Sequence, residues 1–373
     1  MNSYIGKGAK RIDAFDKVTG KGLYASDYPN QFPRLAHIKA LQSPYAHAKI
    51  LKLNTSKAEN LEGVLGIITG NEPGVDWDQY PKVAVLAVER TIWAGQIVAL
   101  VCAETEEIAE EALELIEVEY EQLPHVLNYK EAIDPNPVSV VDPDYEKRPV
   151  GFTDRPGDRA TNRVSPNIVG AFKMNAGDVD KALAEADVIV EGEFWTGRKT
   201  ASPLETPNAI CRYDNDGGIT LWSNGAGVHG VIKQSICRIL KMKQSQVRII
   251  QPYMGGSFGS RLTPYVELLT VLMCLKVKRT VRFQYTRQQT FTMGPSNWPC
   301  YTKVKIGAKK DGTIVGNDYY LCEEIGACLN NSFFSGRLSS SGALPVYGWG
   351  GNLRMDTYAV ATNAVPAAEY RGL

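Results

Sequence analysis

The sequence predicts an α+β protein in two parts, with strands and helices mixed in each part. Before about residue 130, short β-like segments surround one amphipathic helix, and between residues 133 and 167 this pattern stops. New strand-like and helical segments follow. With 373 residues, of which 44% are hydrophobic and 22% charged, the chain is long enough for two domains with large cores.

The first part, residues 1–132, is predicted to be an α/β domain. In the segment "TEEIAEEALELI", Ile108, Ala112 and Ile116 fall on one helical face, and Thr105 is a good N-cap. The β-like segments around this helix are "LAHIKALQS", "AKILKLN", "GVLGIITG", "QIVALVCA" and "EVEYEQLP". The segment 133–167, with six prolines, many charges and no periodicity, is predicted to be a linker.

The second part, residues 168–373, opens with the predicted strand "DVIVEGEFW". There Val188, Val190 and Phe194 share one face, and Glu191 and Glu193 lie on the other. The remaining predicted elements are a strand at "ITLWS", a helix at "VIKQSICRILKM", a strand at "QVRII", a helix capped by Thr263 and Pro264 that runs towards Leu275, and two β segments joined by a hairpin turn at "KKDG".

Composition and charge exclude several function classes. The chain has 41 basic and 41 acidic residues, so nothing in its charge favours nucleic acid or an anionic membrane. The N-terminus lacks a signal-peptide core and no run approaches the roughly 20 apolar residues of a membrane span, so a cytoplasmic protein is expected. The seven cysteines include no C-x-x-C pair and the four histidines lie far apart, so we expect no iron–sulfur cluster, structural zinc or metal ligand on this chain.

Gly225-Ala-Gly-Val-His-Gly230 reads as G-x-G-x-x-G between a strand and a helix, which is the context of a dinucleotide-binding turn. Such a unit also needs an acidic residue about 20 positions further on, and no Asp or Glu occurs between Gly230 and Glu267. The preceding strand also follows an antiparallel-looking segment instead of opening a βαβ unit. A nicotinamide-dependent dehydrogenase is therefore disfavoured, although it is kept as an alternative.

A second glycine loop, "YMGGSFGSR", spans Tyr253–Arg261 and places three glycines around Phe258. It lacks the Gly-Lys-Ser/Thr ending of a nucleotide phosphate loop. Its backbone amides, lying ahead of a helix, can still bind anionic or oxo groups. The alternative is a tight connection in which Phe258 fills the core.

Several motifs, in order along nearly the whole chain, resemble the molybdenum-binding (molybdopterin) large subunit of the xanthine oxidase and aldehyde oxidoreductase family. Besides the loop Gly255–Arg261, which is similar to the family's Gly-Gly-Gly-Phe-Gly-Gly-Lys loop, they are "KVTGKGLYASDYP", "SPYAHAKI", "EVEYEQLPHVLN", "YTRQQTF" and "ATNAVPAAEYRG". The resemblance implies a hammerhead-like α/β domain over 1–132 and the first half of a molybdopterin-binding domain over 168–373.

The resemblance also implies cofactor-binding residues, while no catalytic residue or direct metal ligand is assigned to this chain. Phe258 and its neighbours would line the metal pocket, and Arg371 would lie near metal and substrate. The alternative for Arg371 is a surface ion pair. The implied cofactor-binding residues are Gly225, Ala226, Gly227, Gly255, Gly256, Ser257, Phe258, Gly259 and Arg371.

Three positions depart from the family pattern. Ala226 stands where the family has a glutamine that contacts a molybdenum ligand, Arg261 replaces a lysine, and Leu262 replaces a substrate-side glutamate. Recognition of xanthine is therefore disfavoured. Family members continue for hundreds of residues past the Arg-Gly element, with the general-base glutamate in that second half. The chain is therefore expected to be half of a split subunit, or a truncated one, whose site is completed by a partner chain carrying the C-terminal half.

The implied function is oxidation of an electron-poor carbon, in an N-heteroaromatic ring or an aldehyde, with water as oxygen source. The implied cofactor is a molybdenum–pterin cofactor, expected as molybdopterin cytosine dinucleotide, and iron–sulfur clusters and FAD would lie on partner subunits. A non-catalytic structural half of such a complex is the other alternative, motivated by Ala226 and Ser257.

Overall fold

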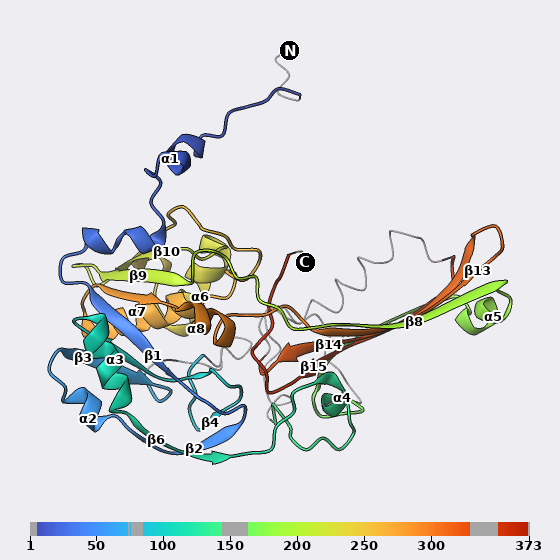
Figure 1. The fold of residues 1–373 in the computed structure, drawn as a ribbon, viewed down its shortest axis with the longest axis horizontal. Coiled ribbons are helices and arrows are strands. Elements are labelled where there is room, and N and C mark those ends of the chain that lie inside the picture. Colours follow the sequence, from blue (N-terminus) through green and yellow to red (C-terminus); the bar gives the residue numbers. More distant parts are fainter. Residues whose placement is uncertain (1–5, 74, 76–84, 144–162, 329–349, 372–373) are drawn as a thin grey trace.

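The computed structural model describes residues 6–73, 75, 85–143, 163–328 and 350–371. Within these residues, helices and strands form a compact body and a long sheet that extends away from it (Figure 1). The body combines a seven-stranded and a three-stranded sheet, and the extended sheet has five strands. The prediction of an α+β fold is confirmed.

The seven-stranded sheet joins strands from both predicted parts of the chain. β1 pairs antiparallel with β5 on one side and parallel with β12 on the other. The sheet therefore crosses the boundary predicted near residue 132, and the division into domains stays a prediction about sequence segments. In spatial order the strands are β11 (Val247–Ile250), β10 (Ile219–Ser223), β9 (Asn208–Tyr213), β12 (Val281–Gln284), β1 (Ala36–Gln42), β5 (Ile97–Ala103) and β3 (Val64–Thr69).

Helices cover both faces of this sheet. On one face lies α7 (Tyr265–Val277), which is apolar nearly all round and buried over its first ten residues. On the other face α3 (Glu106–Glu114) packs on β1 and β5, and Thr105 caps it as predicted by accepting the Ile108 amide. The cap predicted for α7 is wrong, since Pro264 occupies the N-cap position and no side chain caps the helix.

Smaller elements complete the body: α1 (Ala14–Val18), α2 (Ser56–Glu59), α6 (Gln234–Ile239), α8 (Arg287–Thr292), and the sheet of β4 (Arg90–Thr91), β2 (Ala48–Asn54) and β6 (Glu117–Gln122).

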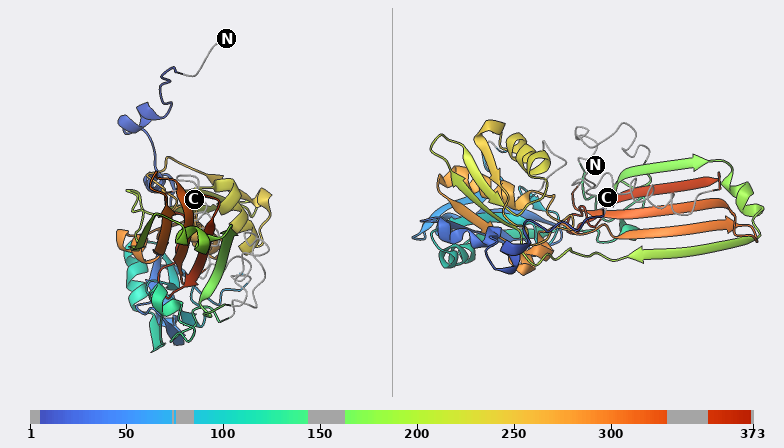
Figure 2. Two further views of the ribbon diagram at one scale, coloured as in Figure 1. Left: turned by 90° about the vertical axis from the view of Figure 1, so that its right-hand side faces the viewer. Right: turned by 90° about the horizontal axis from the view of Figure 1, so that it is seen from above.

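All five strands of the extended sheet come from the second part of the chain, and Figure 2 shows β7 and β8 at its two edges. The predicted hairpin at "KKDG" is confirmed, with Gly312 at φ 90° in the turn. In spatial order the strands are β7 (Ile168–Ala176), β15 (Leu353–Ala361), β14 (Ile314–Gly326), β13 (Cys300–Ala308) and β8 (Val188–Thr196); α4 (Tyr129–Ala132) and α5 (Val179–Ala184) lie near its two ends (Figure 1).

The predicted linker lies partly outside the described residues, which omit 144–162. Its described ends are anchored, because Ser165 Oγ donates to the Ala132 carbonyl at 2.6 Å and Asn167 Oδ1 accepts the Val141 amide at 2.9 Å. Of the helices in the described part of the chain, none combines the length and the apolar character needed to cross a bilayer.

Candidate cofactor site

The glycine loop Tyr253–Arg261 connects β11 to α7. Its backbone is left-handed at Gly256, Phe258 and Gly259, with φ of 110°, 53° and 98°. A Cβ on Gly259 would lie 2.4 Å from the Glu369 carbonyl oxygen, so glycine is needed for this close approach. Phe258 is 48% exposed, so the alternative in which its ring fills the core is wrong.

Arg371 lies directly against this loop, although it is distant in sequence. Its amide donates to the Phe258 carbonyl at 2.9 Å, and its guanidinium carbon lies 5.1 Å from the centroid of the Phe258 ring. A cation–π contact at an exposed site contributes about 0.5–1 kcal/mol. No acid among the described residues forms an ion pair with Arg371, which leaves its guanidinium hydrogen-bond donors available beside the ring.

The amides of this loop are largely unused by the protein itself. The Gly255 amide donates to Glu205 Oε2 at 2.8 Å. Within the described part of the chain, the amides of residues 256–259 donate to no acceptor. Successive amides in a partly left-handed backbone form a concave set of donors, which suits an anionic or oxygen-rich group.

The first glycine loop lies beside the second. The Ala226 amide donates to the Arg261 carbonyl at 2.9 Å, and Gln251 Nε2 donates to the Gly225 carbonyl at 2.5 Å. Gly227, at φ 69°, is the N-cap of a π-helix over Val228–Lys233, which begins three residues before the ordinary helix predicted from Val231. The structure thus places Arg371 against Phe258 of the second loop, and Gly225–Gly227 against the ends of that loop at Gln251, Arg261 and Leu262.

The geometry of the G-x-G-x-x-G segment corrects one prediction. β10 pairs in parallel with β11, so the loop does open a parallel strand–helix–strand unit, contrary to the sequence-based expectation. However, the residue that follows β11 is Gln251, where a nicotinamide-binding unit needs an acid near the second strand's end. The Ala226 amide is also already bonded to the protein. These features still disfavour a dinucleotide site.

Two acids, the buried Glu267 and the half-buried Glu205, support the two loops. Glu267 on α7 is 2% exposed and accepts a hydrogen bond from Ser223 Oγ at 2.5 Å. Ser223 Oγ in turn accepts a hydrogen bond from the Gly225 amide at 2.8 Å. Burial raises the pKa of Glu267, and the hydrogen bond from Ser223 opposes this rise. Glu205 bonds the second loop directly through the Gly255 amide, whereas Glu267 is linked to the first loop through Ser223.

Arg261 points inward, away from the exposed ring of Phe258. It is 4% exposed, its Nη2 donates to the Glu205 carbonyl, and burial lowers its pKa to about 10. Arg261, Glu267 and Tyr285 line a cavity of about 20 Å³. This space holds about one water molecule and no larger ligand. The arginine therefore supports the loop and is not available to a ligand on the Phe258 side.

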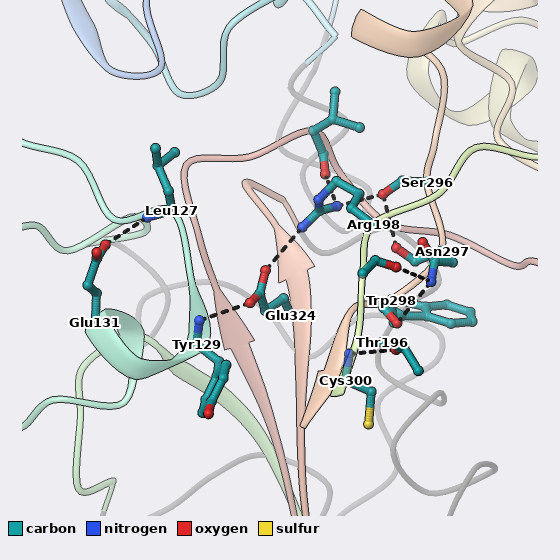
Figure 3. Close-up of polar contacts among 12 residues, drawn as sticks. Leu127, Tyr129, Glu131, Thr196, Arg198, Ser296, Asn297, Trp298, Cys300 and Glu324 are labelled. Atoms are coloured by element: carbon teal, nitrogen blue, oxygen red, sulfur yellow. Dashed lines mark hydrogen bonds and ion pairs between the residues drawn. The ribbon is translucent and has the colours of Figure 1, made fainter. Parts of the chain in front are cut away.

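A polar cluster fixes the segment that leads to Arg371 (Figure 3). Arg198 Nη1 donates to Ser296 Oγ at 2.5 Å and to the Val365 carbonyl at 2.7 Å, while its Nη2 lies 3.5 Å from Glu324 Oε2. Glu324 also accepts the Tyr129 amide at 2.9 Å. Burial lowers the pKa of Arg198 and raises that of Glu324. The cluster ties the C-terminal segment to β14 and α4.

Asn363 provides a second anchor for the same segment. Its amide donates to the Val126 carbonyl at 2.6 Å, its Oδ1 accepts the Val126 amide at 3.0 Å, and its Nδ2 donates to the Ile92 carbonyl at 3.1 Å. The side chain is 1% exposed. Arg371 therefore reaches Phe258 from a segment fixed on both sides.

Sequence reasoning missed these supporting residues. One signal was present: Glu267 is the single acid in the otherwise apolar segment "TPYVELLTVLMCL". A buried acid in such a helix needs a partner, which points to a nearby polar loop. Glu205, Arg198 and Glu324 gave no comparable signal. In the described part of the chain, no three His, Cys, Asp or Glu side chains gather to hold a metal ion.

Among the described residues, the site combines an exposed ring, an arginine outside any ion pair and a run of amides without an acceptor, which is an arrangement suited to an oxygen-rich group. Family models identify the class further. Residues 160–373 match the molybdopterin cofactor-binding domain, and residues 19–124 match the aldehyde oxidase and xanthine dehydrogenase a/b hammerhead domain. The chain belongs to the molybdopterin cofactor-binding family of xanthine dehydrogenases and aldehyde oxidases.

Individual relatives agree with this assignment. The chain is 30% identical over 366 residues to a probable xanthine dehydrogenase subunit of Bacillus subtilis, covering 97% of this chain and 46% of that protein. It is 28% identical to the nicotinate dehydrogenase large molybdopterin subunit of Eubacterium barkeri, covering 83% and 68%. The solved structure of aldehyde oxidoreductase from Desulfovibrio gigas shares 26% identity with a TM-score of 0.80, covering 97% and 39%. The chain spans about half the length of most of these relatives.

Proposed function

We propose that this chain is one subunit of a molybdenum-containing hydroxylase or dehydrogenase whose active site is completed by a partner chain. The substrate class is a small molecule with an electron-poor carbon, an N-heteroaromatic ring or an aldehyde, oxidised with water as oxygen source. The observation that carries the proposal is the contact between Phe258 and Arg371, which joins two family motifs into one exposed surface beside free amides.

The residues fit an oxygen-rich cofactor. The amides of residues 256–259, which bond no acceptor among the described residues, would donate to oxygen atoms of a molybdenum–pterin cofactor, for which we propose the cytosine dinucleotide form. When bound, the cofactor supplies Lewis acidity and a two-electron sink. Arg371, as a permanently charged planar donor, would orient a polar substrate edge or an anionic group, and Phe258 would exclude water beside it.

The partners follow from the same proposal. Electrons must leave through carriers that this chain is not expected to hold, so we assign iron–sulfur clusters and FAD to other subunits, in the cytoplasm. The general base would come from the polypeptide that carries the family's second half. The Bacillus subtilis relative is itself named as one subunit of a xanthine dehydrogenase, which supports a multi-chain assembly.

The proposal is tested by purifying the native complex, identifying its chains by mass spectrometry and measuring molybdenum, pterin and iron. We expect stoichiometric molybdenum and pterin, with a tenfold or greater loss of turnover for Phe258→Ala and for Arg371→Ala. The matched control is Phe291→Ala, which removes a ring of similar exposure, 53%, on α8. A complex without pterin would refute the proposal.

The departure at Ala226 favours a second candidate, a structural half without a catalytic role, because its small side chain offers no polar group to a metal ligand. The same variants discriminate the two. Full molybdenum content with unchanged turnover after both Phe258→Ala and Arg371→Ala would support the structural role.

A further inference from the structure

The N-terminal motif Lys17–Pro29 reaches the glycine loop Tyr253–Arg261, although the two are distant in sequence. The Tyr253 amide donates to the Leu23 carbonyl at 3.2 Å, and Tyr24 and Tyr253 form a parallel β-bridge. The ring centroids of these two tyrosines lie 6.2 Å apart. The first residue of the loop is therefore attached to the N-terminal part of the chain.

The side chain of Tyr253 is held by the turn that precedes Leu23. Its Oη donates to Asp16 Oδ2 at 3.2 Å, and Lys17 Nζ lies 5.0 Å from the centroid of its ring. A Cβ on Gly22 would lie 2.8 Å from the nearest ring carbon of Tyr253, so glycine permits this close approach. The Gly22 amide donates to the Asp16 carbonyl at 2.9 Å, so these contacts come from one compact turn.

Hydrophobic burial does not set the place of this turn. The helix α1 has five residues, none of them buried, and it lies outside the body (Figure 1). So short a helix is not stable on its own, and its apolar side chains Phe15 and Val18 are exposed. The place of the turn is set instead by the contacts with Tyr253 and by the entry of the chain into the body at the buried Ala25.

The loop needs support at both of its ends. Its glycine-rich backbone has many accessible conformations, and the amides of residues 256–259 can converge on one ligand only when the flanking residues are fixed. The buried Arg261 fixes the far end, and Glu205 fixes the Gly255 amide. Tyr253 is the residue at which the near end is fixed.

We propose that Asp16 and Tyr253 are positioning residues for the molybdenum–pterin cofactor. Their hydrogen bond, with Gly22 against the Tyr253 ring, fixes the first residue of the loop and thereby the direction of the amides of residues 256–259. The two side chains act through the loop and do not bind the cofactor themselves. This inference rests on the proposed function, and it gives the N-terminal motif a role in the cofactor site.

The main test measures how fast the native complex releases its pterin after dilution. Asp16→Ala and Tyr253→Phe should each release pterin at least about fivefold faster than the wild type, which is about the effect of losing one hydrogen bond. The double variant should be no faster than either single variant, because all three lack the same bond. Asp16→Asn retains an acceptor oxygen and should stay close to the wild-type rate.

A second variant tests the same contact without changing either bonded side chain. Gly22→Ala should displace the Tyr253 ring, because the new Cβ would lie 2.8 Å from it, and should also speed pterin release. Gly8→Ala is the matched control in the same N-terminal region, since no atom lies within 4 Å of its Cβ position. The release rate of this control should equal that of the wild type.

Hydrogen exchange of the isolated full chain gives a readout that needs no cofactor. In Asp16→Ala the amides of Tyr253 and Leu262, which bond the Leu23 and Gly259 carbonyls, should exchange about fivefold faster. The Leu268 amide of α7 should be unchanged. Faster exchange throughout α7 would indicate a general loss of stability and overturn the positioning role.

The outcomes separate this inference from the proposed function. A wild-type complex that holds pterin, with release unchanged in Asp16→Ala, Tyr253→Phe and Gly22→Ala, would overturn the inference and leave the proposed function standing. Fast release in Asp16→Asn as well would show that the hydrogen bond is not what holds the loop, and would also overturn it. A wild-type complex without pterin would instead refute the proposed function, whatever the exchange of the isolated chain.

Discussion

The site depends on residues held in backbone conformations that ordinary side chains rarely adopt. Phe258 and Arg371 both have positive φ, 53° and 48°, and each such residue costs of order 1–3 kcal/mol. The two are bonded to each other through the Phe258 carbonyl, and Gly259 lies against the carbonyl of Glu369. The strain is thus concentrated where the loop meets the C-terminal segment.

Gly259→Ala should disrupt the contact between the loop and the C-terminal segment. The new Cβ would lie 2.4 Å from the Glu369 carbonyl oxygen, in a left-handed backbone at φ 98°. We expect the free energy of unfolding in urea to fall by about 2 kcal/mol or more. Gly230→Ala is the matched control, because no atom lies within 4 Å of its Cβ position and we expect little change. Equal stability of both variants would contradict the close approach.

Glu267 should make stability depend on pH. Burial raises its folded-state pKa above the ordinary value of 4.5, so the folded protein binds the proton more tightly than the unfolded chain. Its contribution is fully present below about pH 4.5 and is lost as pH rises through the folded pKa. The unfolding free energy of the wild type minus that of Glu267→Gln should therefore decline with rising pH, as measured by urea unfolding at several pH values. A flat difference would show that the carboxyl is already ionised in the fold.

At the scale of the elements, sequence patterns predicted the features that depend on residues close together in the chain. The capped helix α3, the "KKDG" hairpin and the alternation along β8 all follow from residue order. The parallel pairing of β1 with β12 has no local signal, because it depends on contacts between distant segments. The same holds for the site: each loop is visible in the sequence as a glycine cluster, whereas Glu205, Arg198 and Asn363 act through tertiary contacts with distant segments.

Asn363→Ala should loosen the segment that carries Arg371. The substitution removes the side-chain bonds to Val126 and Ile92 and leaves buried backbone groups unpaired, which costs about 1–3 kcal/mol. We expect faster hydrogen exchange at the Arg371 amide. Asn60→Ala, which removes an exposed local bond to the Ser56 carbonyl, is the control and should leave that amide unchanged. Unchanged exchange in Asn363→Ala would show that the Arg198 cluster alone fixes the segment.

At the scale of the whole molecule, the seven-stranded sheet makes the body one structural unit. The four strands from residues 208–284 lie side by side with the three strands from residues 36–103, the two groups meet at the β12–β1 pair, and both share one core. We therefore expect the body to unfold in one transition despite the two family models that divide it.

Tryptophan fluorescence can test this cooperativity. Trp93 and Trp222 are both buried and belong to different predicted domains. In a background in which the other four tryptophans are replaced by phenylalanine, the variants Trp93→Phe and Trp222→Phe each retain one emitter, and the two should report the same urea midpoint after correction for the stability change measured by circular dichroism. Midpoints separated by more than about 0.5 M urea within one variant, between fluorescence and circular dichroism, would indicate two independent domains.

The pairing of β1 with β12 also constrains biosynthesis. β1 ends at Gln42, whereas its neighbour β12 begins only at Val281. At a synthesis rate of about 5–20 residues per second, β12 is therefore made on the order of tens of seconds after β1. During that interval the nascent chain exposes a hydrogen-bonding edge next to apolar β5. The seven-stranded sheet therefore cannot be completed before most of the second part of the chain has been synthesised.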